Sequence, residues 1–157
     1  MGAAKKTTFV NIKNARPGHT YEGVIKAIQE HKVCPFCPKH LATYHKNPIE
    51  INKKHWLATR NMYPYTAARH HYLLIHKKHI EHLSEVSKPA WAELQELIKS
   101  LAKRQHITGG TAMIRFGDTH YTGASVTHLH AHLIQSDPDH PEYNKMKSMP
   151  GVIAKVG

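Results

Sequence analysis

Three histidines alternate with apolar residues in the stretch HLHAHLIQ, at His128, His130 and His132. If this stretch is a β-strand, side chains at alternate positions point to one face, so the three imidazoles would lie together while the residues between them enter the core. On a helix, His130 would lie on a different face from the other two. Imidazole serves as a metal ligand and as a nucleophile near neutral pH, so the row predicts either a metal site or a catalytic centre.

The residues around the row do not match two common metal-site patterns. A binuclear-hydrolase pattern would have an aspartate directly before the third histidine, where this chain has Ala131. A cupin-like pattern would have a glutamate a few residues further on, where the chain reads Leu133, Ile134 and Gln135. We therefore favour nucleophilic catalysis by the middle histidine, with its neighbours orienting it and binding the substrate.

The two cysteines of the chain, Cys34 and Cys37, form the pair CPFC. Cys-x-x-Cys pairs occur in redox sites, disulfides and zinc sites. A thioredoxin-like pair opens a helix directly after a strand, whereas this pair follows a predicted helix and precedes Pro38. A structural zinc site would need two further ligands, for which neutral histidine is suited, and His40 and His45 are local candidates.

The composition is that of a globular chain with a basic surface. Its 157 residues suit a single domain, and 22 lysines and arginines against 11 aspartates and glutamates give a net charge of +11. This excess favours an anionic partner such as a nucleotide. The basic residues are dispersed rather than gathered on one element, so nucleic acid is not the expected ligand. Because we find neither an apolar run of membrane-spanning length nor a signal-peptide core, we expect a cytoplasmic protein without membrane contact.

Hydrophobic periodicity predicts the elements that position these residues. Four apolar residues at helical spacing predict a helix over residues 17–32, namely Tyr21, Val24, Ile25 and Ile28. Strands are predicted over residues 49–52, 55–61, 70–76, 111–116, 125–134 and 151–156. Residues 1–15 are expected to form a flexible arm or a short edge strand, and residues 137–157 a C-terminal extension.

The most regular helical pattern covers residues 88–107 and ends before two glycines. Its predicted buried stripe is Trp91, Leu94, Ile98 and Leu101. Strands and helices in this order fit one α+β domain, built on an antiparallel sheet with flanking helices.

Three motifs in consistent order resemble the histidine triad (HIT) family. The stretch GASVTHLHAHLI resembles its signature, His-x-His-x-His preceded by Gly-x-Ser-or-Thr-Val. HHYLLIHKKHIEHL is similar to its second motif, and NMYPY is similar to a stretch of the diadenosine-polyphosphate hydrolase and phosphorylase branch. The resemblance spans about residues 34–135 and implies a HIT-like domain over residues 1–157.

The resemblance implies a nucleotide hydrolase or nucleotidyl transferase that acts on an α-phosphate through a covalent nucleotidyl-histidine intermediate. The substrate would be a dinucleoside polyphosphate or a nucleoside phosphoramidate. His130 matches the nucleophile, oriented by the backbone carbonyl of His128, and His132 matches the residue that donates to phosphate oxygens. The alternative is a non-catalytic zinc-bearing protein that binds a nucleotide or nucleic acid.

Further substrate contacts are implied at His71, Ser125, the backbone around Gly123, and Asn61. Many relatives carry an asparagine near TAMIRFGD that contacts the phosphate, and Arg115 is the nearest substitute here, because its planar cation suits phosphate oxygens. Whether Arg115 faces the site depends on the parity of its strand.

The resemblance also implies a structural zinc and a homodimer. Relatives with Cys-x-x-Cys complete the zinc site with the last histidine of the second motif and the first of the triad, here His79 and His128, alongside Cys34 and Cys37. Family members are commonly homodimers, and the helix at residues 88–106 is a candidate interface. Its predicted exposed face carries Glu93, Glu96, Lys99 and Lys103.

Overall fold

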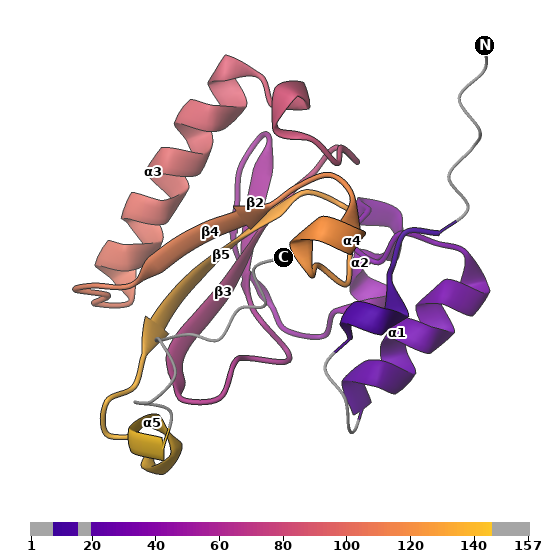
Figure 1. The fold of residues 1–157 in the computed structure, drawn as a ribbon. Coiled ribbons are helices and arrows are strands. Elements are labelled where there is room, and N and C mark those ends of the chain that lie inside the picture. Colours follow the sequence, from indigo (N-terminus) through magenta and orange to yellow (C-terminus); the bar gives the residue numbers. More distant parts are fainter. Residues whose placement is uncertain (1–7, 16–19, 146–157) are drawn as a thin grey trace.

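The computed structural model describes residues 8–15 and 20–145, which form an antiparallel sheet flanked by helices (Figure 1). The sheet has five strands in the order β1-β2-β3-β5-β4. The strands are β1 (Ile49–Asn52), β2 (Trp56–Arg60), β3 (Ala68–His76), β4 (Thr111–Arg115) and β5 (His130–Ser136). The α-helices are α1 (Thr20–His31), α2 (Pro38–Tyr44), α3 (Lys88–Arg104), α4 (Thr119–Thr122) and α5 (Pro141–Lys145), and the short 3-10 helices are η1 (Ile12–Asn14) and η2 (Leu83–Glu85). This architecture confirms the predicted α+β class.

The central strands β3 and β5 place the histidine-bearing motifs side by side. Their antiparallel register sets His71 opposite Ile134, Leu73 opposite His132, and Ile75 opposite His130. Because directly opposed residues point to the same face, His71, His130 and His132 share one face of the sheet.

The other face of the sheet packs against α3, and here one predicted core residue is wrong. The buried residues of α3 are Ala90, Leu94, Leu97 and Leu101, whereas Trp91 is 39% exposed. The reason lies on the neighbouring strand: Trp56 is fully buried there and donates its indole N–H to the Ala90 carbonyl at 2.8 Å. A small residue is therefore needed at position 90. Leu94 and Leu101 are buried as predicted, while Ala90 and Leu97 take the places of Trp91 and Ile98 in the buried stripe.

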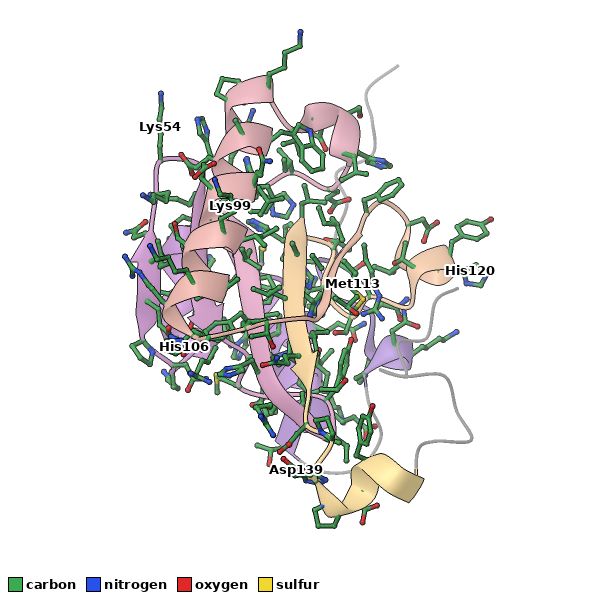
Figure 2. The ribbon with its side chains drawn as sticks, turned by 90° about the vertical axis from the view of Figure 1, so that its left-hand side faces the viewer. Lys54, Lys99, His106, Met113, His120 and Asp139 are labelled. Carbon is green, nitrogen blue, oxygen red and sulfur yellow. The ribbon has the colours of Figure 1, made fainter. Side chains whose placement is uncertain are left out.

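The outer face of α3 carries charged side chains, but one residue predicted to be on it, Glu93, is hydrogen-bonded to the sheet instead. Figure 2 views the molecule from this side, with Lys99 on the outer face of the helix and Lys54 at the turn between β1 and β2. Glu93, predicted to be exposed, instead accepts hydrogen bonds from the backbone N–H groups of His55 and Trp56 at 2.7 and 2.9 Å. Glu93 thus fixes that turn to α3.

Residues 125–129 belong to the strand that the sequence predicted over residues 125–134, but they are not part of β5, which begins at His130. Val126 makes only an isolated bridge to Val10. The N–H groups of Thr127 and Leu129 donate to the carbonyls of Phe9 and Ile80, at 3.0 and 2.8 Å. Two different partners replace a single neighbouring strand, so the regular ladder begins only at His130. The last predicted strand, residues 151–156, lies outside the described residues.

Helices α1 and α2 lie on the side of the sheet opposite α3 (Figure 1). Ile25 and Ile28 of α1 are buried against Val10 and Val126. Prolines interrupt the CPFC stretch as predicted, and α2 begins at the second of them, where the missing N–H group breaks no helical hydrogen bond. None of the helices in the described ranges is long and apolar enough to cross a membrane.

Candidate active site

A cavity of about 370 Å³ opens between the histidine-bearing face of the sheet and the helices α1 and α2. His130 and His132 line it from β5, and Asn61 and Tyr65 line it from the loop between β2 and β3. Ser125 adds a hydroxyl from the segment before β5. The structure thus brings together most of the residues that the sequence singled out as catalytic or substrate-binding.

His130 is held in one tautomer by the backbone. Its Nδ1 donates a hydrogen bond to the carbonyl oxygen of His128 at 2.7 Å, which leaves Nε2 of the neutral ring without a proton. The ring is buried, and Phe36 packs edge-on against it with the ring centroids 5.0 Å apart. Burial, with a smaller contribution from the Arg115 cation, lowers the pKa of His130 to about 4. Near pH 7 this imidazole is neutral and has an available lone pair.

The tautomer of His132 is set by a relay of two successive hydrogen bonds, the first of which comes from the backbone N–H group of Tyr65. The Tyr65 N–H donates to Nδ1 of His71 at 3.1 Å, so a neutral His71 carries its proton on Nε2. That nitrogen lies 2.9 Å from Nδ1 of His132 and donates to it. His132 therefore carries its own proton on Nε2, where it is a hydrogen-bond donor.

Arg115 lies at a position of β4 whose side chain faces the cavity. Arg115 lies opposite His130 in the β4–β5 register and lines the cavity. Its Nη1 donates to the Tyr65 hydroxyl at 3.3 Å. Asn61 lies in the same loop as Tyr65, and its side-chain oxygen accepts from the Tyr63 N–H at 2.9 Å. Its amide nitrogen contacts Nε2 of His71 at 3.1 Å, without a hydrogen bond because both nitrogens carry protons.

Ser125 and Gly123 both line the cavity, but they differ in what they can donate. The Ser125 hydroxyl is hydrogen-bonded to the Tyr21 hydroxyl. Gly123 ends α4 in the left-handed conformation, with φ of 64°, and its N–H donates to the Thr119 carbonyl at 3.2 Å. Gly123 thus shapes the turn, and its own N–H group is already hydrogen-bonded; a phosphate contact from the backbone around it stays a prediction.

Three aromatic residues of this site were missed by the sequence reasoning. Tyr65 and Phe36 lie inside motifs that were already recognised, NMYPY and CPFC, so the signal was present but their contacts with the histidines were not foreseeable. Tyr21 was read only as part of a buried helix face, yet it lines the cavity. Helical spacing identifies an inward-facing residue without telling whether it meets the core or a cavity.

A second cluster, the metal-ligand cluster, consists of Cys34, Cys37, His79 and His128, with one ligand atom of each within 4.8 Å of the others. Nδ1 of His128 lies 3.2 Å from Nδ1 of His79 and 3.2 and 3.8 Å from the sulfurs of Cys34 and Cys37. Tetrahedral bonds of about 2.0–2.1 Å to nitrogen and 2.3 Å to sulfur separate ligand atoms by roughly 3.3–3.8 Å. The cluster therefore has the dimensions of a tetrahedral site.

The protonation of both histidines also suits a metal ligand. Nε2 of His128 donates to the His76 carbonyl at 2.5 Å, so Nδ1 is the unprotonated nitrogen and faces the cluster. Nε2 of His79 lies 3.5 Å from the carboxylate of Glu81, which again leaves Nδ1 toward the cluster. A metal-ligating histidine is commonly oriented by its other ring nitrogen, whose N–H group faces a backbone carbonyl or a carboxylate.

The cysteine chemistry agrees with this arrangement. Cys34 and Cys37 do not form a disulfide. Burial raises the pKa of the Cys34 thiol to about 12, so a thiolate there needs a cation beside it. The local alternatives are wrong: His40 is not in the cluster, and Nε2 of His45 is hydrogen-bonded to the Thr59 hydroxyl at 2.7 Å.

The antiparallel sheet and the row of three alternating histidines, two of which line the cavity, together define a protein of the histidine triad class. Solved structures of this class are similar to the chain. A HIT family hydrolase from Legionella pneumophila Philadelphia 1 is 26% identical, with a TM-score of 0.53 over 66% of this chain and 92% of that one. A HIT family hydrolase from Clostridium thermocellum is 23% identical, with a TM-score of 0.54 over 69% of this chain and 94% of that one. A zinc-bound histidine triad family protein from Mycobacterium smegmatis is 20% identical, with a TM-score of 0.50 over 71% of this chain and 88% of that one.

One family model, described as "Scavenger mRNA decapping enzyme C-term binding", matches residues 34–147. The chain belongs to this family, which is of the histidine triad type. The search of curated proteins with the sequence of this chain found no match. The matched segment begins at the first cysteine of CPFC, so η1 and α1 lie before it.

Proposed function

We propose that this protein is a nucleotide hydrolase or nucleotidyl transferase in which His130 attacks the α-phosphorus of its substrate. The observation that carries this proposal is the hydrogen bond from Nδ1 of His130 to the His128 carbonyl, which leaves the other ring nitrogen unprotonated in a residue lining the cavity. A positioned neutral imidazole divides one difficult displacement into two easier ones.

In the first displacement, Nε2 of His130 forms a bond to phosphorus while the bond from phosphorus to the leaving group breaks. The leaving group departs with the bonding electron pair. His132, with its proton on Nε2, donates a hydrogen bond to a phosphate oxygen, and the Arg115 cation offsets negative charge that develops there. Water or another acceptor then attacks phosphorus, the phosphorus–nitrogen bond breaks, and His130 regains its lone pair.

The character of the cavity supports an anionic ligand. Lys13 and Arg115 line it, and none of the described residues around it is acidic. The substrate that we propose is a dinucleoside polyphosphate or a nucleoside phosphoramidate. An mRNA cap, which the family description brings into consideration, also joins two nucleosides through a polyphosphate. The methylated base of a cap is cationic, however, and the described lining residues include no carboxylate that would pair with it, so the cavity fits a cap less well.

We infer that the metal-ligand cluster holds a structural zinc ion, bound by Cys34, Cys37, His79 and His128. Zinc with four protein ligands supplies folding stability rather than an open catalytic position. Because His128 also provides the carbonyl that holds His130, a fixed His128 keeps the nucleophile in its tautomer. We further propose the homodimer, with the exposed Trp91 face of α3 as its interface.

The test is the mass of the intact protein after a rapid alkaline quench with diadenosine tetraphosphate. An alkaline quench preserves the phosphorus–nitrogen bond to histidine, which acid breaks. We expect wild type to gain an adenylyl group and release mononucleotide, while His130→Asn does neither and retains its zinc. Absence of any adduct or product with diadenosine tetraphosphate, a phosphoramidate and a cap analogue would leave the non-catalytic binding protein as the better description.

A further inference from the structure

One wall of the cavity comes from outside the segment that defines the family. The family match begins at residue 34, but the part of the chain before it contributes several lining residues: Lys13, Asn14, Tyr21, Val24, Ile25 and Ile28. These residues belong to η1 and α1, or lie next to them, on the side of the sheet opposite α3 (Figure 1).

This wall is built into the fold rather than laid over it. Ile25 and Ile28 are both 2% exposed. The side-chain amide of Asn14 donates to the carbonyls of Thr119 and Ala124, at 2.7 and 2.9 Å. Asn11 adds a backbone hydrogen bond to Ser125 at 2.9 Å. The segment is therefore fixed to the turn that leads into the histidine triad.

Tyr21 is the residue of this wall whose side chain contacts Ser125, one of the predicted substrate-binding residues. Its hydroxyl is hydrogen-bonded to the Ser125 hydroxyl. Its ring centroid lies 4.8 Å from that of Tyr63, and the two planes are tilted by 53°. Tyr63 comes from the loop between β2 and β3, so two rings from different walls meet beside Ser125 and form an aromatic corner.

We propose that Tyr21 contacts the substrate and determines specificity, by packing its ring against a planar aromatic group that the substrate carries next to its α-phosphate. The inference rests on the proposed function, because this corner lies beside the reacting phosphorus if Ser125 contacts the phosphate, as the family resemblance implies. The aromatic group is either the base of the transferred nucleotide or a second nucleoside in the leaving group. Stacking of a base on an aromatic side chain is a general means of nucleotide recognition.

The test measures calorimetric binding in a His130→Asn background, which prevents turnover. Three ligands separate the sources of the aromatic group: diadenosine tetraphosphate has one on each side, ATP has only the base of the transferred nucleotide, and inorganic tripolyphosphate has none. Adding Tyr21→Leu should weaken diadenosine tetraphosphate binding about tenfold. Tyr21→Phe keeps the ring and should weaken it about threefold or less.

The pattern across ligands identifies which group is recognised. An equal loss for ATP assigns the corner to the transferred base, whereas a loss confined to diadenosine tetraphosphate assigns it to the leaving group. The matched control is Tyr121→Leu, since Tyr121 is 73% exposed on α4 and does not line the cavity. It should change none of the three affinities.

Other results would overturn the inference. Affinities unchanged by Tyr21→Leu would remove Tyr21 from recognition, and an equal loss for tripolyphosphate would show that the change disturbs the phosphate site instead. A Tyr21→Phe loss as large as that of Tyr21→Leu would assign the effect to the hydroxyl alone. If the His130→Asn parent bound none of the three ligands and wild type formed no adduct, the proposed function itself would fail.

Discussion

At the scale of single residues, the three triad histidines differ in the hydrogen bond that one ring nitrogen of each makes with its surroundings. His128 donates to the His76 carbonyl, His130 donates to the His128 carbonyl, and His132 accepts from His71. In the function proposed here, the same side chain thereby serves as a metal ligand, as a nucleophile and as a donor. The spacing in the sequence identified the three residues, but a tautomer depends on partners that only the folded chain provides.

The relay through His71 leads to a prediction for turnover. His71→Ala should lower kcat about tenfold to a hundredfold, because His132 loses the partner that orients it and sets its proton. Single-turnover rates with diadenosine tetraphosphate would measure this. The matched control is His70→Ala, since His70 is the adjacent residue on the opposite face of β3. Equal rates in both variants would contradict the relay.

At the scale of elements, strands β1 to β4 and helix α3 follow closely from sequence periodicity. Two other expectations were wrong for reasons outside the local pattern. Trp91 has the right spacing for the core of α3, but Trp56 from another strand fills that space. Residues 126–129 alternate like a strand, yet the N–H groups of Thr127 and Leu129 donate to Phe9 and Ile80 rather than to one neighbouring strand. Local sequence cannot reveal a competitor that is distant in the chain.

The corrected face of α3 can be tested by two truncations on the same helix. Leu97→Ala should lower the free energy of unfolding by about 2–5 kcal/mol, because Leu97 is fully buried. Trp91→Ala, although it removes a larger side chain, should lower the free energy of unfolding of the monomer, measured at a protein concentration too low for the proposed dimer, by about 1 kcal/mol or less. Urea unfolding of both variants gives the comparison, and a larger loss for Trp91→Ala would restore the predicted stripe.

The CPFC loop leads to a prediction about metal removal. A strong chelator should lower the melting temperature of wild type, since a metal that binds only the folded chain stabilises it by mass action. Cys34→Ser should contain less than stoichiometric zinc and should melt at a lower temperature that the chelator does not change further. A Cys34→Ser protein that retained stoichiometric zinc would show that the four-ligand assignment is wrong.

At the scale of the whole molecule, buried histidines should make stability fall in mild acid. Burial lowers the pKa of His45 below its ordinary value of 6.5. Between its folded pKa and 6.5 the unfolded chain binds more protons at this site, so stability decreases as the pH falls below about 6.5. One such group contributes at most about 1.4 kcal/mol per pH unit.

His45→Gln should flatten this dependence, because glutamine does not titrate and can still reach the Thr59 hydroxyl that His45 contacts. Urea unfolding at several pH values between 7 and 5 measures the slope. His120→Gln is the control, since His120 is exposed on α4 (Figure 2). If both variants kept the slope of wild type, His45 would have no part in the acid response.

The position of α1 has a consequence for how such proteins diversify. The residues by which the family is recognised begin at Cys34, while one wall of the cavity lies upstream of them. A chain with a different upstream segment would still be classified in the same family and would still carry the same row of histidines. It would nevertheless offer its ligand a different enclosure. Ligand choice can therefore change by exchange of an N-terminal segment, without any substitution in the strand that carries the histidines.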